Sequence, residues 1–393
     1  MVKQGAGKEW RRDTRLTTKG RDPEANHGIV NPPVYHASTV TFPTVAALEE
    51  AAKDRLSGTY YGRFGTPTTF AFEEAVADLE GTDKCIALPS GMAAISLVLL
   101  THLKPGDHLL MVDSAYFPTR KFCDSRLKPI GVETTYYDPL IGAGIAELIR
   151  PNTRLVFTES PGSLTFEVQD LPAIAEAAHA KGALVALDNT WSAGYFLRPF
   201  DLGVDISIQA GTKYLVGHSD AMMGTVATRE ELYADLKWTA VDYGFSAAPD
   251  DCYLALRGIR TLSARMAKHQ ETALNLAHWL KEQPQVAAVL HPALPECPGH
   301  EVWKRDFTGS SGLFSMVLKP IDKAARDEFL DNLQLFAMGY SWGGFESLAI
   351  PSDPKSFRTA APWTVEGPLI RLQCGLEDWQ DLRDDLAAGL AGL

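Results

Sequence analysis

Short apolar runs alternate with longer amphipathic stretches from about Thr66 to Arg257, and this alternation limits the folds open to the chain more than any other feature. Alternating strands and helices predict a mostly parallel sheet that is covered by helices on both faces. The predicted strands are Cys85–Leu88, His108–Val112, Leu155–Thr158, Leu184–Leu187, Ile206–Gln209 and Met222–Ala227. The predicted helices are Thr69–Glu80, Gly91–Leu103, Phe117–Leu127, Ala143–Ile149 and Pro172–Lys181.

The segments on either side of this region have different patterns. Residues 1–65 lack a sustained period and offer one predicted helix, Val45–Leu56, so they form an arm that must lie against something else. Residues 258–393 predict a smaller α+β domain. Its predicted elements are the helix Leu262–Glu282, the strands Val286–Leu290, Leu313–Leu318 and Leu369–Cys374, and a final amphipathic helix. We therefore expect an α/β protein with an arm (1–65), a large domain (66–257) and a C-terminal domain (258–393).

Composition excludes several classes of function. The chain has 393 residues and a formal net charge of −12, which argues against a nucleic-acid or anionic-membrane partner. Its five cysteines form no C-x-x-C pair, and the ten histidines show no metal-ligand spacing, so we expect no disulfide framework and no metal. No apolar stretch is long enough to span a bilayer. We expect a soluble, cytoplasmic enzyme.

Two polar residues at the ends of predicted strands could carry chemistry. Lys213 follows the strand Ile206–Gln209 through small residues, where desolvation could free its amine to form a Schiff base. Considered alone, an exposed loop lysine is the more common case. Asp188 ends a fully apolar strand and needs a cationic partner or several donors, although such a residue can also cap the next helix.

Two further features complete a set that suits one cofactor. Ser90-Gly91-Met92 leads from a strand into a helix, whose free N–H groups suit a phosphate. Tyr116 follows another strand and could stack on a planar ring. Together with Lys213 and Asp188, these are the groups that pyridoxal 5'-phosphate (PLP) requires, and all follow strands at the edge where such sheets bind ligands.

Several motifs in one order resemble the Cys/Met-metabolism family of PLP-dependent enzymes. They are Tyr61-x-Arg63, Ser90-Gly91-Met92, Asp188-Asn-Thr, Ala210-Gly-Thr-Lys213-Tyr and Ser341-Trp-Gly-Gly-x-Glu-Ser347. The resemblance covers nearly the whole chain and implies the PLP-dependent transferase fold type I. It implies that Lys213 binds the cofactor and then shuttles protons, that Asp188 pairs with the pyridine nitrogen, and that Tyr116 stacks on the ring.

The same resemblance assigns the remaining site residues. Gly91, Met92 and Thr212 would hold the phosphate, completed by Tyr61 and Arg63 from a neighbouring subunit of a tetramer made of two catalytic dimers. Many members have Ser where this chain has Ala210, so one phosphate hydroxyl is missing. Arg371 would bind the substrate α-carboxylate, with a structural ion pair as the alternative. The stretch Tyr340-Ser341-Trp342 would border the substrate.

Within the family, Ser341-Trp342 and the segment Glu159-Ser-Pro161-Gly-Ser163 resemble the branch of bacterial cystathionine β-lyases. This implies β-elimination of L-cystathionine to homocysteine, pyruvate and ammonia. A cystathionine γ-lyase or γ-synthase, a cysteine-S-conjugate β-lyase or a cysteine desulfhydrase stay open as alternatives. A silent binding protein is disfavoured because Lys213 and Asp188 are both present, and an NAD-dependent dehydrogenase because no dinucleotide glycine pattern occurs.

Overall fold

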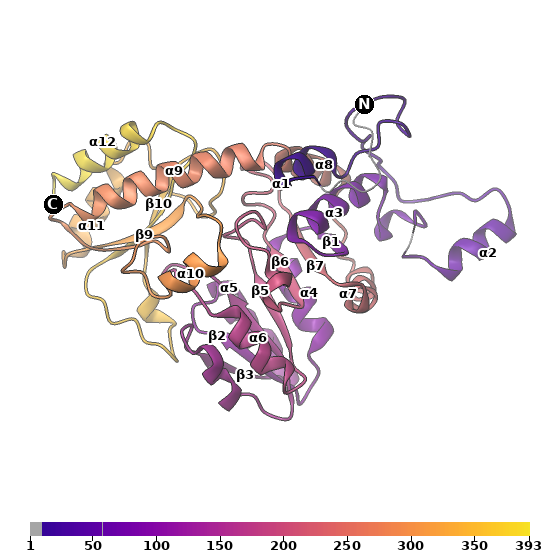
Figure 1. Ribbon diagram of the computed structural model, residues 1–393, viewed down its shortest axis with the longest axis horizontal. Helices are drawn as coiled ribbons and strands as arrows, with labels where there is room; N and C mark the ends of the chain where they lie inside the picture. Colours follow the sequence, from indigo (N-terminus) through magenta and orange to yellow (C-terminus); the bar gives the residue numbers. More distant parts are fainter. Residues whose placement is uncertain (1–9, 57) are drawn as a thin grey trace.

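A seven-stranded sheet forms the centre of the larger part of the molecule (Figure 1). The computed structural model describes residues 10–56 and 58–393. The strand order is β1-β7-β6-β5-β4-β2-β3, with β7 antiparallel to both neighbours and the pairs from β6 to β3 parallel. The predicted mostly parallel sheet is thus confirmed. Its strands are β1 (Lys84–Leu88), β2 (His108–Val112), β3 (Glu133–Tyr137), β4 (Thr153–Glu159), β5 (Leu184–Asp188), β6 (Ile206–Gln209) and β7 (Gly224–Thr228).

Helices lie on both faces of this sheet (Figure 1). Helix α4 packs against β6 and β7, α6 packs against β5, and α3 packs against β1. The apolar sequence of α4 suits a position buried against the sheet, and the Ser90 hydroxyl caps its start by accepting from the Ala93 N–H at 3.1 Å. The helices of this region are α3 (Pro67–Glu80), α4 (Gly91–His102), α5 (Phe117–Phe122), α6 (Leu171–His179), α7 (Glu230–Tyr243) and α8 (Pro249–Ile259).

The sequence pattern missed or misjudged some of these elements. Strand β3 was not predicted because it begins with three polar residues at the edge of the sheet, where no apolar run is needed. Helices α7 and α8 were also not predicted. The predicted helix 143–149 is a short 3₁₀ helix, Gly142–Glu147, and the predicted helix 117–127 changes from α to π geometry at Cys123. Further 3₁₀ turns are Gly62–Phe64, Lys128–Ile130, Pro199–Leu202 and Pro354–Ser356.

A second, antiparallel sheet of four strands forms the C-terminal part, in the order β10-β11-β9-β8. It has a hydrophobic core of its own, to which α9 and α12 contribute. Strand β10 was not predicted because Pro351 interrupts its pattern, which an edge strand tolerates. These elements are β8 (Val286–Leu290), β9 (Leu313–Leu318), β10 (Leu348–Ser352), β11 (Leu369–Gln373), α9 (Leu262–Lys281), α10 (His300–Asp306), α11 (Lys323–Asp331) and α12 (Trp379–Leu390).

The described N-terminal residues contain two helices, of which one packs on the larger part of the molecule and the other stands apart. Helix α1 (Arg12–Thr18), which was not predicted, packs on α3 and buries Leu16. The predicted helix α2 (Val45–Lys53) buries no residue and stands away from the rest of the molecule (Figure 1).

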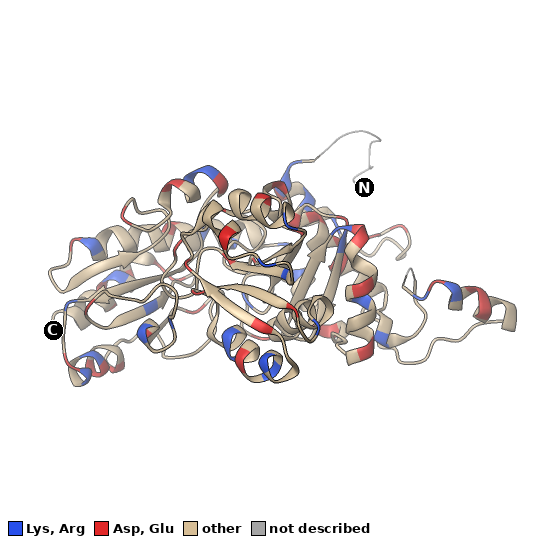
Figure 2. Ribbon diagram, turned by 90° about the horizontal axis from the view of Figure 1, so that it is seen from below, with Lys and Arg blue, Asp and Glu red and all other residues tan. Residues whose placement is uncertain are grey.

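The distribution of charged residues and the apolar content of the helices say little about function. Acidic and basic residues are interspersed along the ribbon in Figure 2. Within residues 10–56 and 58–393, no helix is long and apolar enough to cross a membrane, and no group of three or more His, Cys, Asp or Glu could hold a metal ion.

Candidate active site

The carboxyl ends of β4, β5 and β6 bring the first candidate residues together. Glu159 and Asp188 are the last residues of β4 and β5 and pair with each other in the register of the sheet. Lys213 lies in the turn after the neighbouring strand β6. Parallel strands present their carboxyl ends at one edge, which is where sheets of this kind bind ligands. The predicted association of Asp188 with Lys213 follows from this topology.

Lys213 has the surroundings of a reactive amine. Its Nζ donates to the Ser341 hydroxyl at 2.7 Å and lies 5.3 Å from the centre of the Trp342 ring. Burial disfavours the ammonium form, and the positive charge of Arg371 acts in the same direction. Together they lower the pKa of Lys213 to about 8, against the opposing effect of Asp188. A substantial fraction of this amine is therefore neutral near pH 8.

Thr190 donates hydrogen bonds to one carboxylate oxygen of Asp188 and leaves the other oxygen available to another partner. The backbone N–H and the hydroxyl of Thr190 both donate to Oδ1, at 3.0 and 2.5 Å, and neither bond uses Oδ2. Burial raises the pKa of Asp188, although the bonds from Thr190 and the charge of Lys213 oppose this. A cation placed at Oδ2 would stabilise the ionised form further.

Arg371 and Ser341 form the opposite side of the cluster. The Arg371 Nη2 donates to the Ser341 carbonyl at 2.9 Å, while its buried Nε has no hydrogen-bond partner among the described residues. Burial lowers the pKa of Arg371 to about 10, which leaves the guanidinium charged at neutral pH. Ser341 has φ = +88°, which is uncommon outside glycine and is often found at functional sites. A buried guanidinium nitrogen without a partner fits a carboxylate ligand, whereas no ion pair of Arg371 occurs in the described chain.

Tyr116 lies at the rim of the same cluster. Its backbone N–H donates to Glu159 Oε2 at 2.6 Å, and its side chain is 46% exposed. Burial and the charges of Glu159 and Asp188 raise the pKa of Tyr116, while Arg371 opposes them. The phenol therefore stays protonated at neutral pH, and its side chain is exposed enough to contact a ligand.

The start of α4 closely approaches the turn after β6. A Cβ on Gly91 would lie 2.6 Å from the Cβ of Ala210, so only glycine permits this approach. The first N–H groups of a helix have no partner within the helix, which makes this end suitable for a phosphate. The hydroxyl of Thr212 instead bonds to the backbone of Met223, donating to its carbonyl at 3.1 Å and accepting from its N–H at 2.9 Å.

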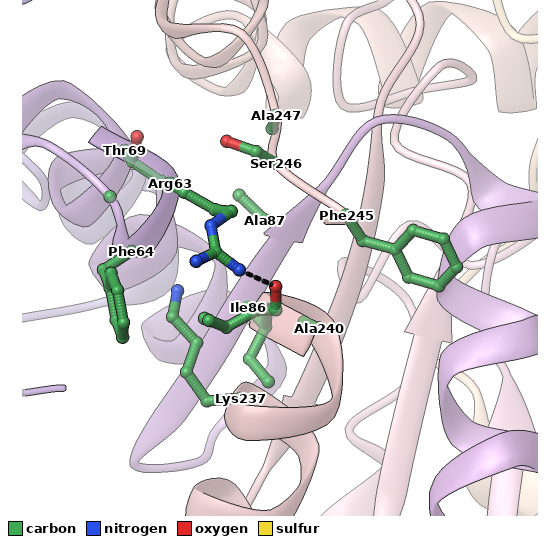
Figure 3. A pocket seen from close by; sticks show the side chains of 12 residues that line it. Arg63, Phe64, Thr69, Ile86, Ala87, Lys237, Ala240, Phe245, Ser246 and Ala247 are labelled. Carbon is green, nitrogen blue, oxygen red and sulfur yellow. Dashed lines mark hydrogen bonds between the residues drawn. The ribbon is translucent and has the colours of Figure 1, made fainter. Parts of the chain in front are cut away.

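Two predicted residues, Tyr61 and Arg63, lie apart from this cluster. The Arg63 guanidinium donates to the Val241 carbonyl, in a pocket between β1 and α7 that Lys237 also lines (Figure 3). Tyr61 and Tyr340 are 41% and 90% exposed. The single chain therefore brings Lys213, Asp188, Tyr116, Arg371, Ser341 and Trp342 together, with Tyr340 exposed near Arg371, and it leaves Tyr61 and Arg63 apart.

Two neighbours of the cluster were not singled out from the sequence as site residues. Thr190 holds Asp188 and also accepts from the Ala210 N–H at 2.9 Å, and Glu159 holds Tyr116. Burial raises the pKa of Glu159 well above its usual range, and the nearby Asp188 adds to this. A carboxyl group at the end of an apolar strand, the signal used for Asp188, would also have identified Glu159.

These residues fit PLP, because a partly buried amine of lowered pKa, a buried carboxylate whose Oδ2 accepts no hydrogen bond from the described residues, and a helix N-terminus share one edge of the sheet. A model of the family described as Cys/Met metabolism PLP-dependent enzymes matches residues 13–391. A protein of Rhizobium johnstonii described as a putative cystathionine β-lyase is 51% identical over 383 residues, 96% of each chain.

Two further relatives agree with this match. The cystathionine β-lyase MetC of Escherichia coli is 46% identical, with 96% of this chain and 98% of that protein aligned. The crystal structure of metB from Corynebacterium glutamicum superposes with a TM-score of 0.89 at 31% identity, covering 96% and 97% of the two chains. The resemblance and the fold type expected from the motifs are both confirmed.

Proposed function

The chain belongs to the Cys/Met metabolism family of PLP-dependent enzymes, and from this premise we propose that it acts as a cystathionine β-lyase. It cleaves the Cβ–S bond of L-cystathionine and yields homocysteine, pyruvate and ammonia, a step towards methionine. The observation that carries this conclusion is the alignment, along nearly the whole chain, with relatives of 46–51% identity that are described as cystathionine β-lyases.

The residues at the carboxyl edge of the sheet would hold the cofactor. Lys213 would bind it covalently, Asp188 Oδ2 would face the pyridine nitrogen, Tyr116 would lie on the ring, and the N–H groups of Gly91 and Met92 would face the phosphate. Bound PLP supplies an electron sink for the charge that develops at Cα. The hydroxyl of Thr212 can join the phosphate site only by giving up a bond to Met223.

The remaining chemistry is assigned to three side chains. Arg371 binds the substrate α-carboxylate through its Nε, which has no partner in the described part of the chain, and through a second guanidinium nitrogen. This orients the Cα–H bond. Once substrate has displaced Lys213 from the cofactor, its free amine can bond to the Ser341 hydroxyl, as it does in the structure, and removes the Cα proton. Lys213 or the protonated Tyr116 then donates a proton to the departing thiolate. Trp342 and Tyr340 border the sulfur side chain.

We also propose that part of the arm (residues 1–65) completes the site of a neighbouring subunit. Its large apolar side chains are exposed in the single chain, as expected of a surface that a second copy covers; they include Ile29, Val30, Val45, Leu48 and Tyr61. Tyr61 and Arg63 would then reach the phosphate of that subunit, in a tetramer of two catalytic dimers.

The two sheets support separate domains over residues 66–257 and 258–393. The five buried free cysteines support a cytoplasmic location.

The products formed from L-cystathionine test this function. The purified, PLP-loaded protein should release pyruvate and homocysteine in equal amounts. Cysteine and 2-oxobutyrate as the main products would instead assign it to γ-elimination. Faster release of pyruvate from cysteine or an S-alkylcysteine than from L-cystathionine would assign it to the desulfhydrase or S-conjugate lyase alternatives.

A further inference from the structure

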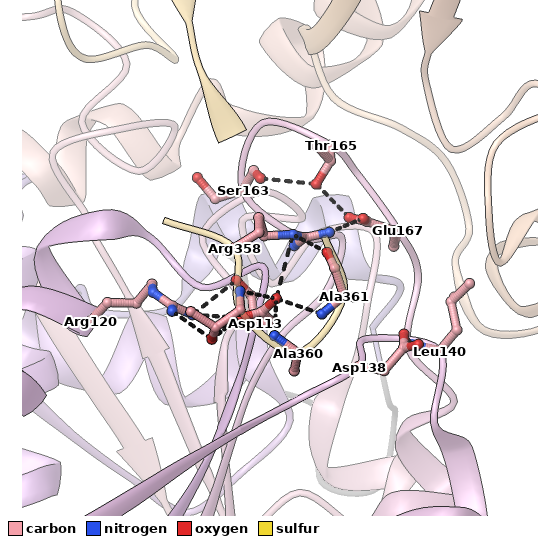
Figure 4. A network of polar contacts seen from close by, with 11 residues as sticks. Asp113, Arg120, Asp138, Leu140, Ser163, Thr165, Glu167, Arg358, Ala360 and Ala361 are labelled. Atoms are coloured by element: carbon pink, nitrogen blue, oxygen red, sulfur yellow. Dashed lines mark hydrogen bonds and ion pairs between the residues drawn. The ribbon is translucent and has the colours of Figure 1, made fainter. Parts of the chain in front are cut away.

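A buried carboxylate next to the site ties two distant segments of the chain together. Asp113 follows β2 and precedes Tyr116 by three residues, and it is fully buried. It accepts from the backbone N–H groups of three consecutive residues of the loop before β11, which are Thr359 (3.0 Å), Ala360 (3.0 Å) and Ala361 (2.8 Å) (Figure 4). One side chain therefore fixes the course of a loop that lies about 250 residues further along the chain.

Two buried arginines balance the charge of this junction. Arg120 Nη1 donates to Asp113 Oδ1 at 2.7 Å, and Arg358 Nε lies 3.8 Å from Asp113 Oδ2. Arg358 also bonds to Glu167, in the loop after β4, as Figure 4 shows. Burial alone would raise the pKa of Asp113, but the bonds from the loop N–H groups and from Arg120 keep it below its usual value. The junction is thus ionised, and it joins the ends of β2 and β4 to the loop.

The loop that Asp113 fixes carries one aromatic side chain to the rim of the site. The ring centre of Phe357 lies 5.6 Å from that of Phe117, the residue after Tyr116. Phe117 is 50% exposed, and Tyr116 beside it is 46% exposed, so the rings belong to the open edge of the cluster. A displaced loop would remove Phe357 from this edge, whereas Lys213 lies in the turn after β6 and Arg371 is held in β11 by pairing with β9 and β10.

We propose that Asp113 is a positioning residue that favours long sulfur substrates, because it holds Phe357 against Phe117 as one wall of the passage occupied by the part of the substrate beyond sulfur. This proposal rests on the function proposed above. With the α-carboxylate at Arg371 and Cα at Lys213, a long thioether must extend past the rim, whereas a short one ends before it. The wall therefore affects the two classes of substrate differently.

The test compares a long and a short substrate in three variants. Phe357→Ala removes the wall and leaves the buried charges intact, whereas Asp113→Asn weakens the bonds that hold the loop. Lys355→Ala is the control, because the Lys355 side chain makes no hydrogen bond or ion pair in the described chain. The rates of ammonia release from L-cystathionine and S-methyl-L-cysteine are measured together with the absorbance of the bound cofactor.

We expect Phe357→Ala to lower kcat/KM for L-cystathionine at least tenfold, mainly through KM, and to change that for S-methyl-L-cysteine less than twofold. Asp113→Asn should show the same selectivity, Lys355→Ala should match the wild type, and the cofactor absorbance should not change. Equal losses for the two substrates, or no loss in Phe357→Ala, would overturn the proposal. The products of the wild-type protein test the proposed function independently of the variants. If 2-oxobutyrate replaced pyruvate, that function would be rejected, whatever the ratio of the rates for the two substrates.

Discussion

At the scale of single residues, Arg371 is the group whose surroundings point most clearly to a missing ligand. Its Nε is buried with no partner among residues 10–56 and 58–393, although its Nη2 is bonded to Ser341. Leaving such a nitrogen unpaired costs free energy, which a substrate carboxylate would recover on binding.

Substitution of Arg371 should therefore weaken substrate binding. Because a hydrogen bond to a charged group contributes about 1.5–3 kcal/mol, Arg371→Met should raise KM for L-cystathionine by about 10- to 100-fold. Steady-state kinetics measure this, with the partly exposed Arg383→Met on α12 as a control that keeps the wild-type KM. An unchanged KM in Arg371→Met would assign Arg371 a purely structural role.

The lowered pKa of Lys213 predicts how the apoprotein takes up its cofactor. Only the neutral amine attacks an aldehyde, so the attachment rate should rise by about tenfold per pH unit below pH 8 and level off above it. Stopped-flow absorbance after mixing apoprotein with PLP gives this profile. A midpoint near 10.5, the ordinary value for lysine, would show that Lys213 is not desolvated.

At the scale of elements, strands with a continuous apolar run were predicted, including the edge strands β1 and β8, while the edge strands β3 and β10 were not. Strand β2 consists of five buried residues and gives a clear signal, but β3 and β10 lie at sheet edges and include polar residues or proline. The position of Asp188 and Lys213 followed from the same logic, because strand ends share one edge. The loop of Ser341 and its contact with Lys213 depend on packing between distant segments, which no local pattern encodes.

The approach of α4 to the turn after β6 gives a prediction for that junction. Ala210 faces Gly91, so Ala210→Ser would place a hydroxyl beside the N–H groups proposed to bind the phosphate. One added hydrogen bond, at about 0.5–1.5 kcal/mol, should tighten PLP binding by about 2- to 10-fold, measured as the dissociation constant of PLP. Gly91→Ala should weaken binding, because its Cβ would overlap Ala210. A weaker affinity in Ala210→Ser would remove this turn from the phosphate site.

At the scale of the whole molecule, the prediction from the sequence and the structure of the single chain differ most in the arm (residues 1–65). Tyr61 and Arg63 were expected at the cofactor phosphate, yet in the single chain Arg63 bonds to Val241 and Tyr61 is largely exposed. The motif itself cannot say which subunit it serves, because that depends on how copies assemble.

Mixed subunits test whether the arm serves a neighbour. Arg63→Ala and Lys213→Ala should each be nearly inactive, but a hybrid dimer of the two has one site with both residues intact. Since random pairing makes half of the dimers hybrid, co-expression should restore about a quarter of the wild-type activity. A mixture as inactive as either parent would place Arg63 in the site of its own chain.

In the proposed function, one partly buried lysine at the carboxyl edge of the sheet, Lys213, both holds the cofactor and moves the substrate proton. Borohydride reduction of the PLP-loaded protein, followed by peptide mass spectrometry, identifies the lysine that carries the cofactor. We predict that the label lies on Lys213 and that Lys213→Ala retains no label and no lyase activity. A label on another lysine, such as the buried Lys237 beside Glu73, would contradict the account.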